Sequence, residues 1–449
     1  MGDASQRTRE IALALSVGVV LADSSIVTLA LPDILQDFDS TVVGVSWVLT
    51  AFNLALALAI LPAARVGRVE PRAGWAVGLA IFVGASAGCA AADSEAVLVT
   101  ARIVQALGGA LTIACAIELL ARMLGSHERA APLWGGAGTI GVAVGPAAGG
   151  LLTELFSWQS IFLVQIPLLL LVPAAIGLRL RDPEPGPEGA LDLRPEIGLA
   201  LISAGLTGAL FLLVILLTEG WGISPLGAAA TVSMIPLATF GARYLFERAG
   251  PPKSAALAGG LAAAGGLAAL AVLPGASFAL TLQPQLLIGI GLALALPVLT
   301  LAAVGGRDPV GSRAAATIAA RHAGIVIGIA ALAPVLSAEL DSQRAAAQDA
   351  TASLLLDAPL PPEAKLSLAE ALADGIDAAD GQLPDVAPAF DTISPDGPDS
   401  VAYAELEAGV VDQIERGATN AFSLPFLAAA AFAMLALIPI SMLRKPRDE

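Results

Sequence analysis

The chain has 449 residues, of which 56% are hydrophobic and only 14% are charged, and its formal net charge is −16. Soluble domains carry about 25% charged residues, so this composition excludes a soluble globular protein. Long apolar runs recur from end to end, and the mean hydropathy of +0.80 indicates helices that cross a bilayer. A pI of about 4.5, with no basic patch outside the loops, excludes nucleic acid as a partner.

Twelve apolar runs are separated by polar breaks or by Pro and Gly, which predicts an all-α polytopic membrane protein with about twelve transmembrane helices. The first run has the length of a signal peptide, but an acid interrupts it and no cleavage site follows, so we interpret it as a retained helix. The predicted spans are residues 11–31, 42–63, 73–92, 96–119, 133–153, 158–178, 196–217, 225–246, 254–274, 280–303, 314–337 and 420–443.

The distribution of basic residues supports this topology independently of hydropathy. If the N-terminus is cytoplasmic, 18 of the 23 Lys and Arg residues lie on the cytoplasmic side, and the five short outer loops contain none. The positive-inside rule requires this asymmetry, and an error of one span would destroy it. We therefore predict a multi-pass protein of the cytoplasmic (plasma) membrane with both termini in the cytoplasm.

Two polar segments divide the predicted helices into bundles. Residues 179–195 form a Pro-rich charged linker, so we predict an N-terminal six-helix bundle in residues 1–178. The C-terminal helical bundle is predicted in residues 196–337 and 420–449. Residues 338–419 then form a long loop on the outer side, between the last two helices.

The long outer loop, residues 338–419, is acidic. It holds 17 acidic residues against three basic ones, and therefore carries −14 of the net charge of −16. We interpret this acidic extracytoplasmic domain as a solvated cap on the outer mouth, or as a vestibule that concentrates cations. Within it we predict a helix opened by Pro361-Pro362, with Leu366, Leu372 and Ile376 on one side. We predict a second helix capped by Ser400, with Leu406, Val410 and Ile414 on one face.

Asp23 lies near the middle of the first span, where a carboxylate costs on the order of 2.5–3.5 kcal/mol and is functional by default. Arg102 in the fourth span lies at nearly the same depth, at a rise of about 1.5 Å per residue. We therefore predict that the two side chains pair. Protonation of Asp23 would break the pair and leave Arg102 unpartnered, which would make it a proton-coupling switch; a permanent structural ion pair is the alternative.

The fifth span carries Gly141, Gly145 and Gly149 at intervals of four residues. This spacing places all three on one helix face and permits the close approach of a second helix. Pro146 removes a backbone donor within the same stretch and favours a bend. We predict a gating hinge at these four residues, with close packing alone as the alternative.

Four motifs follow one another at matching spans in the first 180 residues. They are Ala22-Asp23-Ser24-Ser25-Ile26-Val27-Thr28-Leu29-Ala30-Leu31-Pro32, the runs Arg102–Ala110 and Gly141–Gly150, and Trp158-Gln159-Ser160-Ile161-Phe162. Together they resemble the signatures of the drug/proton antiporters of the major facilitator superfamily, in the branch that usually has fourteen helices. The resemblance implies a two-bundle fold that opens a central cavity alternately to each face, and the fifth-helix motif is the one most indicative of antiport.

Two features depart from that family. The loop after the second span, Ala63–Arg72, places Gly67 where the family usually has Asp and Glu70 where it usually has Gly, which changes the charge pattern of the inner gate. The second half also looks one helix pair short of fourteen. Either the spans 196–217 and 225–246 replace that pair, or the second bundle is incomplete.

Polar residues in several spans are candidates for the substrate cavity. Arg321 lies on the cytoplasmic side of the midplane in the eleventh span, where a cation needs a wet cavity or a partner such as an anionic substrate group or backbone carbonyls. His322, with an ordinary pKa of about 6.5, is suited to relay protons; a hydrogen-bonded structural role is the alternative. The other candidates, which would line the cavity or bond between helices, are Asn53, Gln105 and Gln165.

The sequence contains no Walker loop, catalytic triad or metal-ligand cluster, so we predict no enzyme activity, no cofactor and no metal site. We predict a proton-coupled antiporter, driven by the proton gradient, that exports a drug-like compound or a metabolite. Only 4% of the residues are aromatic, which favours a narrower substrate range than planar lipophilic drugs. The alternatives are a facilitator without proton coupling and a transport-inactive scaffold that presents the acidic domain 338–419 to an extracytoplasmic protein partner.

Overall fold

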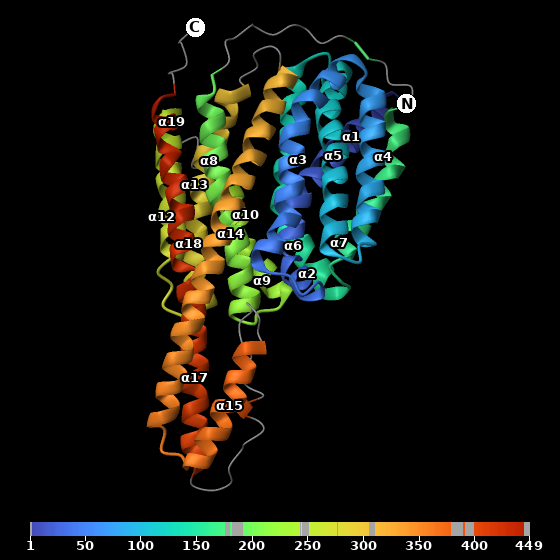
Figure 1. Ribbon diagram of the computed structural model, residues 1–449. Coiled ribbons are helices and arrows are strands. Elements are labelled where there is room, and N and C mark those ends of the chain that lie inside the picture. Colours follow the sequence, from blue (N-terminus) through green and yellow to red (C-terminus); the bar gives the residue numbers. More distant parts are fainter. Residues whose placement is uncertain are drawn as a thin grey trace.

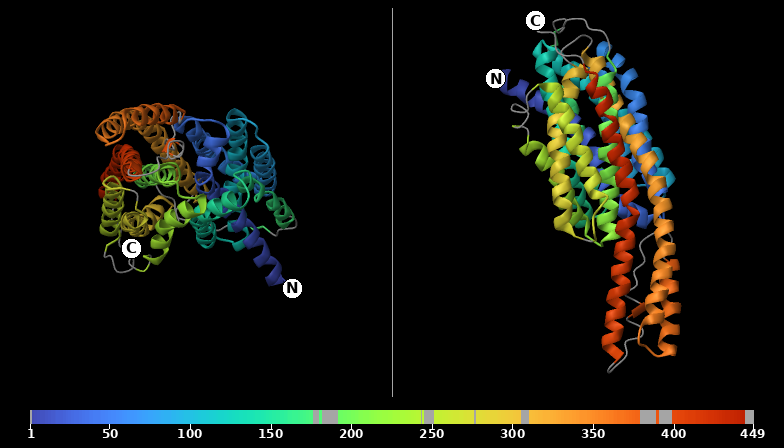
Figure 2. Two further views of the ribbon diagram at one scale, coloured as in Figure 1. Left: turned by 90° about the horizontal axis from the view of Figure 1, so that it is seen from below. Right: turned by 90° about the vertical axis from the view of Figure 1, so that its left-hand side faces the viewer.

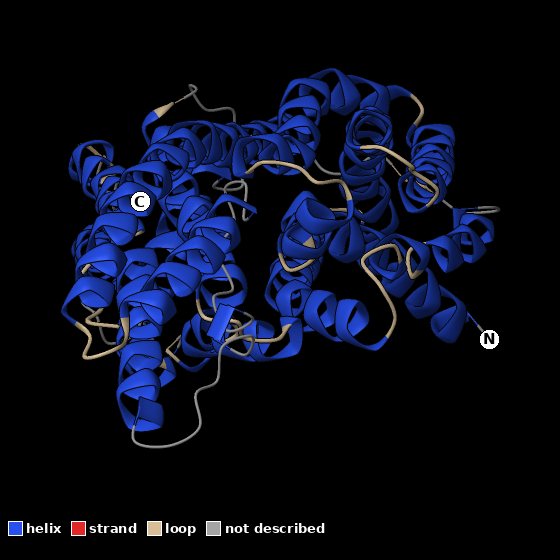
Figure 3. Cartoon of the chain, turned by 60° about the horizontal axis from the view of Figure 1, so that its bottom comes forward, coloured by secondary structure: helices blue, strands red, loops and turns tan. Residues whose placement is uncertain are grey.

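The computed structural model shows an all-helical protein (Figure 3). Ten helices of the described part are long and apolar enough to cross a membrane, and two further apolar helices, Ser160–Ala174 and Pro225–Gly241, are shorter. Each of the twelve predicted spans therefore coincides with an apolar helix, whereas the predicted linker 179–195 lies mostly outside the described residues. The structure describes residues 2–175, 180–181, 192–242, 244, 251–275, 277–304, 310–378, 389–390 and 399–443.

The first half of the chain forms one helical bundle. In it α5 packs against α3 and α4, and α1 packs against α6. The chain turns between α1 and α2 just before Pro32, which has no N–H group to continue the helix. The elements are α1 (Gly2–Thr28), α2 (Leu31–Asp37), α3 (Val42–Val69), α4 (Pro71–Ala90), α5 (Glu95–Leu124), α6 (His127–Leu155), α7 (Ser160–Leu163) and the 3₁₀ helix η1 (Ile166–Ala175).

The second half forms another bundle from six apolar segments. α8 packs against α14 and α18, α12 packs against α13, and α10 packs against α13. The helices of the predicted seventh and eighth spans are thus integral to this bundle. Its elements are α8 (Arg194–Ile215), the π-helical turn η2 (Leu216–Gly220), α9 (Pro225–Val232), α10 (Met234–Gly241), α12 (Pro252–Leu270), α13 (Phe278–Val304), α14 (Val310–Asp357), α18 (Ser423–Leu435) and α19 (Leu437–Ser441).

Proline explains why two of the predicted spans are irregular. The sixth span consists of α7 and η1, and Pro173 lies inside η1. The eighth span is divided at Ser233 into α9 and α10. Pro236 lies in the first turn of α10 and cannot donate to the carbonyl of Val232, so an unbroken α-helix would lose this hydrogen bond.

The acidic domain is a helical extension of the second bundle (Figures 1 and 2). α14 runs without a break from the membrane-spanning part through the predicted boundary at residue 338, because nothing helix-breaking follows Pro334 until Pro359. α15 (Pro362–Ala378) packs against α14, and α17 (Asp399–Ala421) packs against α14 and leads back to α18. The predicted loop is therefore largely built from prolonged membrane helices.

The acidic domain has a small apolar core of its own. Leu372, Leu406 and Val410 are buried in it, as their helical spacing predicts. Leu366, in contrast, is 73% exposed, so its predicted position in this core is wrong. Leu368 is completely buried instead, because α15 turns the face that carries Leu368 and Leu372 toward the core.

The two bundles lie side by side, and α14 lies at the boundary between them (Figure 1). It packs against α3 of the first bundle and against α8 of the second. The first turns of α1 and the end of α19 lie at one end of the molecule, and the helical extension projects from the other end (Figure 1). This arrangement places the polar residues of α3 and α14 between the bundles, at the membrane-embedded level.

Candidate functional site

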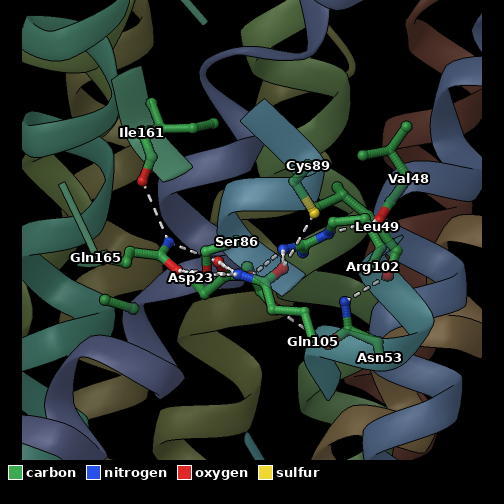
Figure 4. Close-up of polar contacts among 12 residues, drawn as sticks. Asp23, Val48, Leu49, Asn53, Ser86, Cys89, Arg102, Gln105, Ile161 and Gln165 are labelled. Carbon is green, nitrogen blue, oxygen red and sulfur yellow. Dashed lines mark hydrogen bonds and ion pairs between the residues drawn. The ribbon is translucent and has the colours of Figure 1, made fainter. Parts of the chain in front are cut away.

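An ion pair is enclosed in the first bundle. Nη1 of Arg102 on α5 donates to Oδ2 of Asp23 on α1, and both side chains are completely buried (Figure 4). The pairing predicted from their matching depths is confirmed. The second carboxylate oxygen, Oδ1, accepts from Nε2 of Gln105 at 3.1 Å and from Nε2 of Gln165 at 2.8 Å. Both oxygens are therefore satisfied, as a buried charge requires.

Arg102 has further contacts that fix its guanidinium group. Its Nε donates to the carbonyl oxygen of Val48 at 3.2 Å, and Nη1 also donates to Oε1 of Gln105 at 2.6 Å. The guanidinium lies over the ring of Phe52, 4.1 Å from the centroid, and 5.6 Å from the centroid of Phe162. Such contacts stabilise a cation where water is excluded. Nη2 has no hydrogen-bond partner among the described residues, so one donor remains free for another acceptor.

Small polar side chains extend the network to α4. Ser86 accepts from Nε2 of Gln105 at 2.9 Å and donates to Oε1 of Gln165 at 2.8 Å. Cys89 lies within 3.7 Å of Oε1 of Gln105 (Figure 4). The network therefore connects α1, α4, α5 and the segment between α7 and η1. Gln105 and Gln165 are completely enclosed in it, so their role as cavity residues stays a prediction for another state of the molecule.

The glycine stripe of α6 holds α1 in place. Added Cβ atoms at Gly141 and Gly145 would overlap the carbonyl of Gly18 and the side chain of Ser25, and one at Gly149 would overlap the backbone of α1. Two helices in such close contact leave no room for side chains between them. The predicted close approach at this stripe is confirmed.

The stripe also carries a hydrogen bond between the helices. Ser25 donates to the carbonyl oxygen of Val142 at 3.1 Å, and Ser25 is two residues from Asp23. α6 continues as one helix through Pro146, from His127 to Leu155. The hinge role of Gly141, Gly145, Pro146 and Gly149 stays a prediction, whereas their effect on the position of α1 follows from the geometry.

A second polar contact joins the two bundles. Nδ1 of His322 on α14 lies 2.5 Å from Oδ1 of Asn53 on α3. The same amide oxygen accepts from Ser24 at 3.2 Å, and Nδ2 of Asn53 donates to the carbonyl oxygen of Leu49 at 2.8 Å. Because an amide oxygen can only accept, the proton of this contact belongs to Nδ1 of His322. Through Ser24, the contact reaches the residue that directly follows Asp23 on α1.

Arg321 precedes His322 on α14 but has no such partner. It lies deep within the protein, and it makes no hydrogen bond or ion pair with any described residue. Its side chain keeps some accessible surface, whereas His322 is buried. The two neighbours therefore differ: His322 makes a hydrogen bond between the bundles, whereas Arg321 has no counter-charge within the described part of the chain.

A comparison with protein families identifies the family of this chain. The model of the Major Facilitator Superfamily matches residues 13–337, which is more than half of the chain. The chain belongs to the major facilitator superfamily. The resemblance drawn from the four motifs is therefore confirmed, and transport rather than enzymatic catalysis is the activity of this family.

Relatives of this chain include drug efflux proteins. The multidrug resistance protein Stp of Mycobacterium tuberculosis is 35% identical over 166 residues, 36% of this chain and 31% of that protein. The drug efflux pump JefA of the same species is 32% identical over 204 residues, 43% of this chain and 40% of JefA. The tetracenomycin C resistance and export protein of Streptomyces glaucescens is 32% identical over 249 residues, 54% of this chain and 45% of that protein. The chain thus matches less than half the length of these relatives.

Solved structures of the superfamily share the fold. A bacterial homologue of the human lysosomal transporter Spinster, in an inward-facing and unoccupied conformation, superposes with a TM-score of 0.66 at 17% identity, over 100% of both chains. The D-xylose–proton symporter superposes with a TM-score of 0.51 at 13% identity, over 71% of this chain and 88% of that chain. At these identities the likeness establishes the two-bundle architecture only.

At the end of the molecule that carries the first turns of α1, the bundles meet at Glu118 of α5. This carboxylate is buried and reaches the first turn of α14, where a Cβ on Gly311 would overlap it. Its Oε2 lies 3.5 Å from Nε2 of His127. Gly67, which stands where the family usually has Asp, packs beside it, since a Cβ there would lie 3.4 Å from Cγ of Glu118. The nearest neighbour of that Cβ position is the carbonyl oxygen of Ala114, at 2.9 Å, so Gly67 lets α3 lie close to α5 beside Glu118.

At the end of the bundles from which the helical extension projects, the contact between them involves acids and an amide. Gln36 of α2 donates to the carboxylate of Glu219 of η2 at 3.3 Å. Burial raises the pKa of the nearby Asp33 carboxyl, and the negative charges of Glu154 and Asp37 raise it further. This group of acids lies across the boundary between the first and second bundles. No motif in the sequence indicated it, because its members come from three separate helix ends.

The structure thus divides the predicted site residues into three groups. Asp23, Arg102, Gln105 and Gln165 form one network with the unpredicted Ser86. Asn53 and His322 form the bridge between the bundles, and Arg321 lies beside it with no partner in the described ranges. The glycine stripe lies behind Asp23 and positions α1. Sequence reasoning missed the aromatic shell of Arg102, because nothing in a sequence shows which rings of an apolar helix face a charge.

Proposed function

We propose that this protein is a proton-coupled exporter of small molecules in the cytoplasmic membrane. It works by alternating access, and both its termini lie in the cytoplasm. The observation that carries the proposal is the enclosed Asp23–Arg102 pair. A titratable acid in the middle of a membrane bundle, paired with a single cation and shielded from water, is suited to exchange its charge for a proton. The drug resistance and export functions printed in the names of its relatives support the direction of transport.

In the proposed mechanism, the proton binds to the carboxylate of Asp23. Neutral Asp23 no longer balances Arg102, whose cation is then buried with only the carbonyl of Val48, the amide of Gln105 and the aromatic rings around it. Uncompensated buried charge is costly, on the order of several kcal/mol per ion, so the network rearranges until water or another acceptor reaches Arg102. This cost is the drive for the conformational change.

The change in the network reaches the bundle interface through α1. Ser24 and Ser25 follow Asp23 directly; Ser24 bonds to Asn53, which contacts His322 of the second bundle, and Ser25 bonds to α6. A shift of α1 therefore alters a contact between the bundles and the close packing against α6. Asp23, Arg102, Asn53 and His322 are thus connected by an unbroken series of hydrogen bonds and chain neighbours.

The test requires a substrate, which a susceptibility screen supplies. Cells that lack the protein are compared with cells that overproduce it across drugs and metabolites, and the compound with the largest difference is used in proteoliposomes. Asp23→Asn should abolish uptake driven by a pH gradient, while counterflow exchange without a gradient continues. Asp412→Asn, the same change at an exposed acid of α17, should leave both unchanged.

The outcomes separate the proposed function from its alternatives. Full gradient-driven transport by Asp23→Asn would refute the role of Asp23. Counterflow by the wild type that does not respond to a gradient would identify a facilitator without proton coupling. The absence of any flux would favour the scaffold alternative, for which the separately packed apolar core of the acidic domain offers a platform for a protein partner.

A further inference from the structure

The faces of α14 around Arg321 are set by helix geometry. Successive residues of an α-helix are about 100° apart, so each contact fixes a direction. Ile327 is 52% exposed and marks the face turned away from the protein. His322 marks the face toward α3, since it contacts Asn53. Gly324 marks the face toward α8, since a Cβ there would overlap the backbone of α8.

Arg321 lies between the faces toward α3 and α8. By the same rotation it is more than about 100° away from Ile327, and so it points into the protein between the two bundles. Ile325 follows one turn later in nearly the same direction. Both side chains keep accessible surface although both directions lead into the protein. The accessible space at this level therefore presents a guanidinium group next to an apolar side chain.

The charge of Arg321 has no counterpart among the residues that the structure describes. Among the described residues Asp23 is paired with Arg102, and no acid contributes to the electrostatic surroundings of Arg321. His322 cannot compensate for it, because its Nδ1 donates to Asn53 and a histidine is neutral or cationic. A buried cation that the protein leaves unpaired next to accessible space is suited to an anion that comes from outside the protein.

We propose that Arg321 binds the anionic head group of the transported compound, a carboxylate or a phosphate, and that the space beside Ile325 holds its apolar body. The substrates would then be amphipathic organic anions. This inference rests on the proposed export function, and it adds the class of substrate. The shortage of aromatic residues, 4% of the chain, agrees with an aliphatic or compact body rather than a large planar one.

The charge of the substrate changes the energetics of transport. When one monoanion leaves the cell and one proton enters, two elementary charges move in the same direction, because outward movement of a negative charge equals inward movement of a positive one. Transport would then respond to membrane potential as well as to pH. One-for-one exchange of a proton for a monocation would instead move no net charge.

The binding test uses purified protein in lipid nanodiscs without any gradient. The probes are octanoate, octyl phosphate and the neutral octanamide, and affinities are measured by titration calorimetry. Wild type should prefer at least one anion over octanamide by about tenfold or more, as expected for a desolvated charge pair. Arg321→Gln should remove the preference, Arg321→Lys should keep part of it, and Arg416→Gln at an exposed outer site should not affect it.

A measurement on the wild type covers the case in which Arg321→Gln does not fold. Phenylglyoxal modifies accessible arginines, and mass spectrometry maps the modified positions. Octanoate or octyl phosphate should slow the modification of Arg321 and leave that of Arg416 unchanged. Equal binding of octanoate, octyl phosphate and octanamide, a preference retained in Arg321→Gln, or modification of Arg321 that neither anion slows would each overturn the proposal.

The experiment distinguishes this inference from the export function. Asp23→Asn should bind octanoate or octyl phosphate like the wild type, since Arg321 is intact, although gradient-driven transport is lost. Anion binding without any proton-driven flux would leave the site standing and refute the export function. Proton-driven flux of neutral or cationic compounds, without anion binding, would do the reverse.

Discussion

Two arginines within the membrane-spanning helices have opposite surroundings. Arg102 in the first bundle is enclosed on all sides and paired with Asp23, and amides and two aromatic rings complete its environment. Arg321 in the second bundle has no partner among the described residues and keeps accessible surface. Binding of a proton removes the negative charge that balances an arginine in an enclosed ion pair. Binding of an anion supplies a negative charge to an arginine that has no partner. On the proposed functions, the first bundle handles the proton and the second handles the substrate.

The contrast between the two arginines is tested most directly by removing each charge. Arg102→Gln leaves the carboxylate of Asp23 buried and unbalanced, so it should lower the free energy of unfolding by about 3–5 kcal/mol. Arg321→Gln removes a charge that nothing in the described protein balances, so stability should stay the same or rise. Denaturant titration of both variants in the same detergent measures the difference.

Equal destabilisation by the two substitutions would contradict the comparison. It would mean that Arg321 is held by contacts as strong as those of Arg102. The double variant Asp23→Asn with Arg102→Gln provides a control, because replacing both charges of a buried pair is far less costly than replacing one. It should recover part of the stability lost by Arg102→Gln.

The two bundles also use the same packing device, and a smaller effect is expected there. Gly141 of α6 packs on α1, and Gly324 of α14 packs on the carbonyl of Ala200 of α8. Ala at either position forces the helices apart and should cost about 1–3 kcal/mol. Gly136 has no neighbour within 4 Å of its Cβ position, so Gly136→Ala should be neutral or slightly stabilising.

Unfolding midpoints of these three variants measure the packing effect. If Gly136→Ala were as harmful as Gly141→Ala, backbone flexibility rather than close contact would explain the glycines. In Gly141→Ala the displaced α1 carries Asp23, so we also expect weaker proton coupling. Gly324→Ala should alter substrate binding instead, because α14 carries Arg321.

The sequence predicted the fold well because lipid imposes a simple rule. Every membrane helix needs an apolar run of sufficient length, and the basic residues lie on one side of the membrane, so spans can be recognised one by one. What the sequence could not show is where a helix ends outside the bilayer. α14 continues to Asp357 because water tolerates a solvated helix of Ala, Gln and acidic residues as readily as a loop. The orientation of α15, and hence the burial of Leu368 instead of Leu366, depends on tertiary packing.

The sequence predicted the site residues only where placing the side chain in the membrane costs much free energy. Asp23 and Arg102 were found because a charge in the membrane is expensive, and their equal depth implied the pair. Ser86 was missed because a serine in an apolar helix costs little and bonds to its own backbone. Arg321 was also found because a charge in the membrane is costly, but the sequence could not show whether the side chain has a partner. The absence of one among the described residues is what only the structure shows.

The contact between the bundles at Gln36 and Glu219 involves acids instead of arginines. Asp33 of α2 lies near Asp37 on the same element, Glu154 of α6 and Glu219 of η2, and Gln36 donates across the boundary to Glu219. Burial and the charges of Glu154 and Asp37 raise the pKa of Asp33 from its ordinary value of 3.8. Burial and these two acids of the first bundle therefore disfavour the ionised form of Asp33, and its charge also acts on Glu219 of the second bundle, where the bundles are in contact.

The contact at Gln36 and Glu219 should respond to pH, and the effect should be smaller than that of the glycine substitutions. Below a pH of about 3.8, Asp33 is protonated whether or not the bundles are in contact, so pH has no differential effect there. As pH rises above that value, Asp33 ionises first in the separated state, and the contact loses stability until the raised pKa is passed. Acid on this side of the molecule should thus favour the closed contact.

Replacing Asp33 tests whether this one carboxyl carries the pH response. Asp33→Asn should strengthen the contact at neutral pH and reduce the pH dependence, whereas Asp39→Asn on the neighbouring turn should do neither. Distances between spin labels on α2 and α9, measured as pH falls from about 7 to about 4, would show the contact closing in the wild type. An equally strong pH dependence in Asp33→Asn would assign the effect to Glu154 or Glu219 instead.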